Sequence, residues 1–369
     1  MSRIAPTSPQ HLAQALKQAS QQNQTIHLEG NGSKSRMGGP ISSADVSIST
    51  AALDRLLQYE PNDLTISVEA GMPWARLQEI LRANRQMIPL DPPCYDQATV
   101  GGVLAANTSG PRRRLYGSVR DVVIGMKFAT LEGKLIQSGG MVVKNVAGLD
   151  MGKLMIGSFG TLAAIAVVNF KLFPIPPASR TFIFSFRDLA PAIEKRDRIL
   201  ASVLQPAAID LLSPGSLGRT GWTLAIQAGG SERVIERYAR EMIGAEVLVE
   251  DGEPMFWAAV REFPAAASVV VRISVALQDL GEVLGSLPLP AVARGGNGIA
   301  YASFSSLNEA AEWMKTHPWP AVIEWRSESV FATDRQWPTQ GTNFPVMQRV
   351  KSMLDPTHLL NRGRLYGRI

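Results

Sequence analysis

Hydrophobic positions in the first half of the chain follow both helical and strand periods. Apolar residues at helical spacing from Leu12 to Ala19, after a Ser/Pro start, predict a short surface helix over residues 8–22. Residues 73–85 show the same period and predict an amphipathic helix. Apolar or alternating runs bounded by turn residues predict strands, at residues 25–28, 46–49, 64–68, 122–129, 134–138 and 161–172.

A proline cluster at Pro174, Pro176 and Pro177 interrupts this pattern and predicts a domain boundary. Beyond it, strands at residues 181–186, 222–227 and 268–274 alternate with helices at 190–204 and 231–243, and a last helix covers 343–354. The fold class is therefore predicted to be α+β. We expect a first domain over residues 1–175, a smaller antiparallel α+β domain over 176–340, and a C-terminal tail over 341–369.

Composition and charge exclude several classes of function. A chain of 369 residues with 45% apolar and 19% charged residues is long enough for two packed domains. The net charge of +5 is scattered, and the dense basic run Arg112, Arg113 and Arg114 is isolated. The run could bind an anion or an acidic partner face, or be a solvated loop. No basic face interleaved with aromatic residues is present, so we expect no nucleic-acid partner.

Cysteine and histidine usage argues against metal chemistry. The single cysteine, Cys94, excludes an internal disulfide and a Cys-rich zinc or iron–sulfur motif. The four histidines have no ligand spacing, so no metal site is expected. The polar N-terminus lacks an apolar signal core, and glycines interrupt the longest apolar stretch, so no transmembrane segment is expected. We expect a cytoplasmic protein, with any attachment to the inner membrane made through its partners.

Two glycine-rich segments are the candidate binding chemistry. Gly30-Asn31-Gly32-Ser33-Lys34 follows a predicted strand, and glycine lets backbone N–H groups approach an anion closely. The third glycine of a Rossmann motif is absent, and a plain polar turn is the alternative interpretation. The second segment, Thr99 to Gly110, reads as a loop in which Gly101 and Gly102 let the chain lie against a flat or phosphorylated ligand.

Several motifs that follow in order carry a family resemblance: Thr99-Val100-Gly101-Gly102, Tyr116-Gly117, Arg120-Asp121, Lys144-Asn145-Val146-Ala147-Gly148 and Gly157-Ser158-Phe159-Gly160-Thr161. Together they resemble the PCMH-type, two-lobed FAD-binding domain of the vanillyl-alcohol-oxidase superfamily. Within it, the chain looks most like the FAD-binding subunits (E subunits) of bacterial glycolate oxidases. The C-terminal run Leu354 to Arg364 resembles the family ending, which implies that the tail packs back on the FAD domain.

The resemblance implies an FAD site. The residues expected to contact the cofactor are Gly30, Asn31, Gly32, Ser33, Lys34, Pro92, Thr99, Val100, Gly101, Gly102, Ala105, Asn107, Gly110, Tyr116, Gly117, Gly157, Ser158, Gly160, Thr161 and Ile165. The Gly30 and Thr99 segments would hold the pyrophosphate, and Ile165 would lie near the adenine. Ala163, Leu149 and Arg362 depart from the usual Gly, Tyr and Pro of the family.

The resemblance also bears on covalent attachment of the flavin. Relatives with covalent flavin usually carry a His in the first glycine loop, and this loop has none. Cys94 follows Pro92-Pro93 and could approach the flavin, but a small buried thiol is the commoner role. We therefore expect non-covalent FAD.

The catalytic residues of the family are missing. Catalytic relatives carry a motif resembling His-x-Gly-Asp-Gly-Asn-x-His, and the nearest segment here, Arg294 to Tyr301, has no histidine. No catalytic residue is assigned. The resemblance then implies a subunit of a complex that oxidises glycolate, a small 2-hydroxy acid, with a catalytic FAD subunit and an iron–sulfur subunit as partners. Two alternatives are a free-standing FAD-dependent 2-hydroxy-acid dehydrogenase and a structural subunit with a vestigial flavin pocket.

Overall fold

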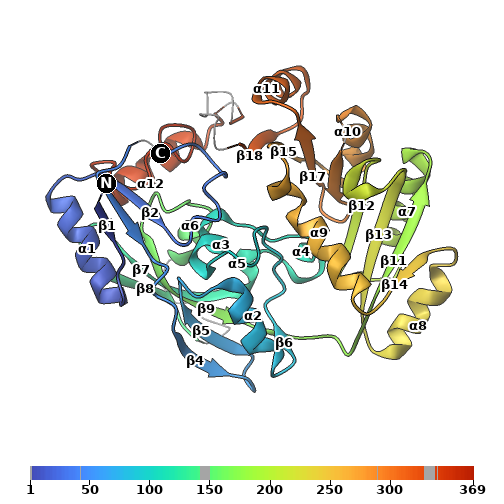
Figure 1. Cartoon of the computed structure of the whole chain (residues 1–369), viewed down its shortest axis with the longest axis horizontal. Coiled ribbons are helices and arrows are strands. Elements are labelled where there is room, and N and C mark those ends of the chain that lie inside the picture. Colours follow the sequence, from blue (N-terminus) through green and yellow to red (C-terminus); the bar gives the residue numbers. More distant parts are fainter. Residues whose placement is uncertain (1, 42, 142–149, 289, 328–336, 339) are drawn as a thin grey trace.

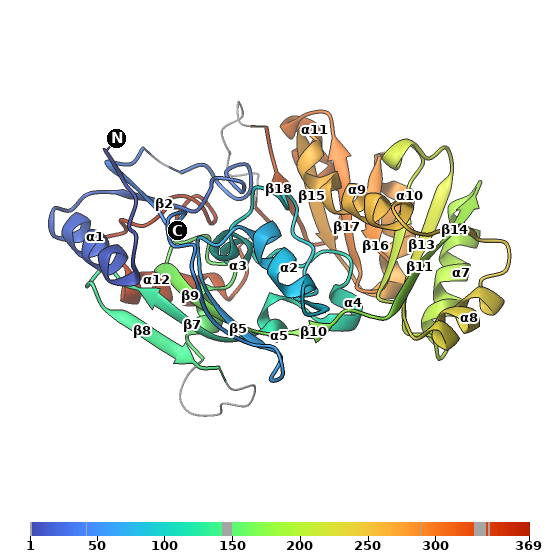
Figure 2. The same cartoon turned by 60° about the horizontal axis from the view of Figure 1, so that its bottom comes forward.

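A computed structural model describes residues 2–41, 43–141, 150–288, 290–327, 337–338 and 340–369. The chain forms two lobes that lie side by side in both views (Figure 1, Figure 2). One lobe contains two main sheets and both ends of the chain, and the other is built on one large sheet. Helices and antiparallel sheets are mixed throughout, and the α+β fold class predicted from the sequence is confirmed.

A small parallel sheet with one helix forms the outer part of the first lobe. The strands are β1 (Ser2–Ile4), β2 (Ile26–Glu29) and β3 (Val46–Ser49), with β3 in the middle. Helix α1 (Pro9–Gln21) begins at Ser8, whose side chain accepts a hydrogen bond from the backbone of His11. The apolar face of α1 packs with these strands into one core cluster.

A five-stranded antiparallel sheet forms the rest of the first lobe. Its order is β4-β5-β9-β7-β8, with β4 (Leu56–Glu60), β5 (Thr65–Glu69), β7 (Val123–Ala129), β8 (Leu135–Gly139) and β9 (Ala164–Lys171). Helices α2 (Trp74–Arg82) and α3 (Val100–Ala106) pack against it through Trp74, Leu77 and Val103. The smaller elements are β6 (Gln86–Met87), α4 (Arg113–Tyr116), α5 (Val119–Val122), α6 (Gly152–Met155) and β10 (Phe173–Pro174).

The second lobe is an eight-stranded antiparallel sheet in the order β14-β11-β13-β12-β16-β17-β15-β18. The strands are β11 (Ala178–Phe186), β12 (Ala208–Leu212), β13 (Trp222–Gly230), β14 (Glu246–Leu248), β15 (Val269–Ser274), β16 (Ala291–Arg294), β17 (Ile299–Phe304) and β18 (Ala321–Trp325). Four helices contribute to the core on one face, and these are α7 (Leu189–Ala201), α8 (Glu232–Glu241), α10 (Leu280–Ser286) and α11 (Leu307–Thr316).

The other face of the large sheet is shared between one helix and the first lobe. Helix α9 (Gly252–Ala266) packs on it through Trp257, Val260 and Phe263. Nearer β18, Trp325 and Val270 pack instead with Met37 and Ala106 of the first lobe. The two lobes therefore meet on this face, where a polar cavity also lies.

The chain returns to the first lobe at its end. Helix α12 (Phe344–Leu354) packs on the five-stranded sheet through Val350 and Leu354, and Leu359 and Leu360 join the core around α1. Lys351 and Asp355, both fully buried, form an ion pair there, and Lys351 Nζ also donates to the Thr161 carbonyl. Tail and first lobe thus share one core.

Most elements predicted from the sequence are present, including the hairpin β7–β8 around Glu132-Gly133. One prediction is wrong. Residues 99–106 were expected to form a loop, but they form α3, in which Thr99 is the N-cap and Asn107 ends the helix with a φ of 54°. The small residues Gly101 and Ala105 suit a helix that is packed closely against its neighbours. The motif Lys144 to Gly148 and Leu149 lie outside the described residues.

Candidate functional site

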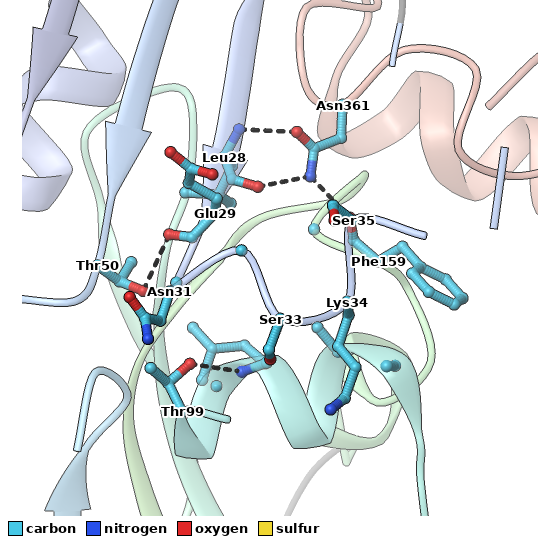
Figure 3. Close-up of a pocket in the computed structure, with 18 of the residues that line it drawn as sticks. Leu28, Glu29, Asn31, Ser33, Lys34, Ser35, Thr50, Thr99, Phe159 and Asn361 are labelled. Carbon is cyan, nitrogen blue, oxygen red and sulfur yellow. Dashed lines mark hydrogen bonds between the residues drawn. The ribbon is translucent and has the colours of Figure 1, made fainter. Parts of the chain in front are cut away.

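A cavity of about 270 Å³ lies in the first lobe, where β2, α3, the start of β9 and the C-terminal tail converge. Figure 3 shows the loop after β2 crossing above α3, with Asn361 reaching in from the tail. We call it the first cavity. Glycines and other small residues such as Ala105, Ala106 and Ala163 make up much of its lining, so backbone groups are accessible to a ligand there.

The loop of residues 30–34 supplies the polar wall of the first cavity. Within the described parts of the chain, none of its five backbone amides has a protein acceptor. The amide of Ser35 is the first to be paired, with the carbonyl of Gly32 at 2.9 Å. A Cβ on Gly30 would overlap the hydroxyl oxygen of Thr99, so only glycine lets this loop approach α3. A run of free amides beside a cavity is a site for an anion.

The start of α3 has a different role from the one expected. The amides of Val100 and Gly101 donate to the carbonyls of Met72 and Ala70, and that of Gly102 donates to Thr99 Oγ1 at 3.2 Å. Because these donors are already paired, the expectation that they grip a pyrophosphate is not supported. Gly101, Gly102 and Ala105 instead form a flat floor of the first cavity.

Two buried cations without an acidic partner line the first cavity. Lys34 is 7% exposed and donates to the Pro93 carbonyl, and Arg364 is 6% exposed and donates to backbone carbonyls only. Neither forms an ion pair within 4.0 Å among the described residues. Burial lowers the pKa of Lys34 to about 8, and burial with the nearby Arg326 charge lowers the pKa of Arg364 to about 10. An anion in the cavity would relieve both penalties.

The structure brings many predicted site residues together in the first cavity, but not all. Those that line it are Gly30, Asn31, Gly32, Ser33, Lys34, Thr99, Gly101, Gly102, Ala105, Gly160 and Ile165. Those that line other cavities are Asn107, Gly110 and Gly157 in the second cavity described below, and Tyr116 in a third. Those that line none of these cavities are Pro92, Val100, Gly117, Ser158 and Thr161.

The residues outside the cavities have structural contacts instead. Ser158 Oγ donates to the Met155 carbonyl at 2.8 Å, and Thr161 Oγ1 donates to the Ser158 carbonyl at 2.7 Å. Both hydroxyls therefore hold the turn before β9. Gly117, with a φ of 86°, packs against Asp121. Hydroxyls and glycines in a motif do not by themselves show whether they face a ligand.

Sequence reasoning missed much of the first-cavity lining. The additional residues are His27, Leu28, Glu29, Ser35, Ile41, Thr50, Ala106, Phe159, Ala163, Asn361 and Arg364. Most are neighbours of predicted residues along β2, α3 and β9. Asn361 and Arg364 come from the tail, and the tail motif was the one signal for them. Ala163, a departure from the family pattern, is 1% exposed at the wall of the cavity.

A second cavity of about 340 Å³ lies between the lobes and adjoins the first, since Ala106 and Phe159 line both. Arg113, Arg272 and Arg294 line it. Some lining residues also have buried polar side-chain atoms without a hydrogen-bond partner, and these atoms are Thr108 Oγ1, Arg294 Nε, Asn297 Oδ1, Trp325 Nε1 and Trp337 Nε1. Buried polar atoms of this kind suit a small polar ligand. Burial raises the pKa of Tyr301, which also lines the cavity, to about 12.

The structure separates the three arginines of the basic run. Arg112 forms a two-pronged ion pair with Asp91, and Arg113 faces the second cavity. Arg114 crosses to the second lobe and donates to the Pro206 carbonyl at 3.3 Å. Arg112 and Arg114 therefore have contacts within the protein, whereas Arg113 is exposed.

Comparison with known proteins identifies the first lobe. Residues 2–139 match the family described as "FAD binding domain". The chain carries an FAD-binding domain. The free amides and uncompensated cations of the first cavity fit this cofactor, whose diphosphate is anionic. The FAD predicted from the sequence is thereby confirmed, and with it the place of the chain among FAD-dependent oxidoreductases.

Similarity to known proteins extends beyond residues 2–139. The chain is 29% identical to glycolate oxidase subunit GlcE of Escherichia coli over 98% of both chains. It is 27% identical to glycolate oxidase subunit GlcD of Bacillus subtilis, over 58% of this chain and 46% of that protein. The 4-ethylphenol oxidase of Gulosibacter chungangensis has the same fold, with a TM-score of 0.72 at 14% identity over 98% of this chain and 88% of the oxidase.

The described residues of this FAD-binding protein contain neither a candidate membrane-spanning helix nor a candidate metal site. Across the described residues, no helix has both the length and the apolar composition needed to cross a membrane. The same residues contain no group of three or more His, Cys, Asp or Glu side chains arranged to hold a metal ion.

Proposed function

We propose that this chain is the FAD-binding subunit of a complex that oxidises glycolate to glyoxylate, with its FAD held non-covalently in the first cavity. The observation that carries the proposal is the run of free amides at residues 30–34, together with two buried cations, Lys34 and Arg364, that form no ion pair among the described residues. The full-length similarity to a glycolate oxidase subunit supports the substrate class.

The free energy of binding that such a site can provide is sufficient to hold a dinucleotide. Hydrogen bonds from amides to a charged group contribute roughly 1.5–3 kcal/mol each. Three of the loop amides would then supply most of the roughly 8 kcal/mol of a micromolar Kd. Burial of the adenine against apolar residues such as Ile165 adds to this. The site needs no covalent bond to retain its cofactor.

The adjoining cavities suggest how the cofactor lies. Each is near the lower end of the roughly 300–1,000 Å³ usual for ligand sites, and a dinucleotide would need both. With the diphosphate on the loop of residues 30–34, one end points toward Ile165 and the other passes Ala106 and Phe159 into the second cavity. We propose that the flavin ring occupies the latter side.

The reaction itself needs more than this chain. When bound, FAD would accept a hydride from a C–H bond of the substrate. In the second cavity, Arg113 can hold a carboxylate, whereas Arg294 is paired with Asp210, and none of the described lining residues is a histidine. Tyr301, with a pKa near 12, is a poor base at neutral pH. We therefore infer that a catalytic flavoprotein subunit and an iron–sulfur subunit complete the complex.

The test compares the isolated chain with the native complex. Both are loaded with FAD and mixed with glycolate under anaerobic conditions, and the flavin absorbance is followed. The proposal expects the isolated chain to keep its oxidised spectrum and the complex to reduce an artificial acceptor. The complex should lose activity when this subunit is omitted and regain it on addition of the FAD-loaded chain. If the complex is fully active without the chain, the proposal is wrong.

A free-standing 2-hydroxy-acid dehydrogenase is the second candidate, and the position of Arg113 at the second cavity favours it. Arg113, Arg272 and Arg294 line a space next to the first cavity, and because Arg272 is paired with Glu324 and Arg294 with Asp210, Arg113 is the arginine there that remains available to a small carboxylate. Reduction of the bound flavin by glycolate or lactate in the isolated chain would support this candidate. The substitution Arg113→Gln should then raise KM, because Arg113 has no acidic partner among the described residues.

A structural subunit with a vestigial pocket is the remaining alternative. Its signature is a chain that never takes up FAD but still restores the complex. The uncompensated cations of the first cavity argue against it, because a cavity without an anionic ligand keeps both charges buried at a cost.

A further inference from the structure

The C-terminal tail forms one wall of the first cavity. Asn361 Nδ2 donates to the carbonyls of Leu28 and Phe159, and Asn361 Oδ1 accepts from the amide of Leu28 at 2.7 Å. A Cβ on Gly160, whose φ is 69°, would lie 2.8 Å from Asn361 Nδ2. The tail is therefore fitted to β2 and to the turn before β9, at the wall of the first cavity (Figure 3).

Arg364 holds the end of the glycine loop through hydrogen bonds to its carbonyls. Its Nη2 donates to the Lys34 carbonyl at 3.0 Å, and its Nη1 donates to the carbonyls of Ser35 and Gly39 at 3.2 Å. The Arg364 carbonyl in turn accepts from the Gly39 amide at 2.8 Å. The guanidinium thus fixes the peptide groups that follow the free amides of residues 30–34, and it sets the orientation in which those amides face the cavity.

The charge of Arg364 is not balanced by the protein. The side chain is 6% exposed, its Nε is buried without an acceptor, and no carboxylate lies within 4.0 Å among the described residues. Its other partners are carbonyls and the Phe159 ring, whose centroid lies 5.2 Å from the guanidinium carbon. A buried cation with no anionic partner costs free energy until a negative charge comes near. The side chain lines the first cavity, so an anion bound there supplies the missing charge.

We propose that docking of the C-terminal tail and binding of a diphosphate in the first cavity stabilise each other, with Arg364 as the positioning residue that couples them. The inference rests on the proposed FAD site. The coupling is reciprocal: the ligand lowers the cost of burying Arg364, and the docked tail orders the loop that binds the ligand. Because the diphosphate is the part of the ligand that interacts with Arg364, ADP should stabilise the docked tail as FAD does. Riboflavin, which lacks phosphate, should not stabilise it.

Hydrogen exchange on the full-length apo chain tests the coupling. The amides of Gly39, Asn361 and Arg364 are followed without ligand and with FAD, ADP or riboflavin, since their acceptors are the Arg364, Ile26 and Asn361 carbonyls. FAD and ADP should slow exchange at these amides at least tenfold, and riboflavin should leave it unchanged. Binding of FAD with no protection of the tail overturns the inference but leaves the proposed function standing. No binding of FAD at all overturns both.

Two variants separate the role of the side chain from general stability. Arg364→Gln should weaken FAD binding by tenfold or more and abolish protection of the tail by ADP. Arg364→Lys, which keeps the charge but loses the planar fork, should retain part of both effects. Arg368→Gln changes an exposed arginine of the same tail and should match the wild type. Tight FAD binding by Arg364→Gln, equal to wild type, would overturn the inference. The wild-type exchange experiment decides it if Arg364→Gln does not fold.

Discussion

Asn361 and Leu28, 333 residues apart in the sequence, exchange a pair of hydrogen bonds through the Asn361 side chain and the Leu28 backbone. This contact closes the first lobe with the end of the chain. It places the tail beside the strand that leads into the glycine loop. The candidate site is therefore built from three distant segments, which are the β2 loop, the region from α3 to β9, and the tail.

Gly30 is predicted to be irreplaceable for cofactor binding. The substitution Gly30→Ala places a Cβ on the Thr99 hydroxyl and pushes the loop away from α3. We expect the Kd for FAD to rise by roughly tenfold or more, which corresponds to about 1.4 kcal/mol. Isothermal titration of the apo chain with FAD measures this change.

Two further variants check the cause. In Gly30→Ala combined with Thr99→Ala, the obstructing hydroxyl is absent, so FAD binding should recover in part. Gly252→Ala is the matched control, because a Cβ at Gly252 meets nothing within 4 Å. Unchanged FAD affinity in Gly30→Ala would show that the loop does not bind the cofactor closely.

Binding of FAD is predicted to weaken at alkaline pH because of Lys34. Its pKa is about 8 in the apo chain, and the groups that face it are Cys94, Glu262 and the Pro93 carbonyl. The diphosphate favours the charged amine. Affinity should therefore be level below about pH 8 and fall by up to about tenfold per pH unit above it.

The pH profile of Lys34→Met is the decisive comparison. This variant should bind FAD more weakly at neutral pH and lose the slope above the pKa of Lys34. The substitution Lys315→Met, at an exposed lysine of α11, should keep the wild-type profile. If the FAD affinity of Lys34→Met still falls with pH above about 8, the titrating group is not Lys34.

The buried pair of Lys351 and Asp355 is predicted to dominate the stability of the tail. Lys351→Met removes the partner of a fully buried carboxylate and leaves the Thr161 and Leu360 carbonyls without their donor. We expect the free energy of unfolding in urea to fall by about 3–5 kcal/mol. Lys315→Met breaks an exposed pair with Glu312 and should cost less than about 1 kcal/mol. Equal losses in the two variants would contradict the account.

The fold class could be predicted from the sequence because helices and strands leave local patterns of apolar residues. Apolar periods located β2, β3, β5, β7, β9 and α1. Strand β4 was missed because it is an exposed edge strand with little pattern. Helix α3 was missed because Gly101 and Gly102 read as a loop, although tight packing against Ala70 requires small residues within the helix.

The candidate site was predictable only in part, for a physical reason. The loop of residues 30–34 carries its own signal, since glycines after a strand expose backbone amides. Whether an amide is free depends on distant acceptors such as Ala70 and Met72, which no local motif reports. The importance of Arg364 depends likewise on the absence of a carboxylate around it, which only the packed structure shows.

The most direct test of the account is the flavin content of the purified chain. The chain is purified without added cofactor, or reconstituted with FAD, and its visible spectrum is recorded before and after acid denaturation. The account predicts a yellow protein with one FAD per chain, and denaturation should release all of the flavin into the supernatant. A colourless chain that takes up no FAD would contradict the central claim, and flavin that stays with the precipitated chain would contradict non-covalent binding.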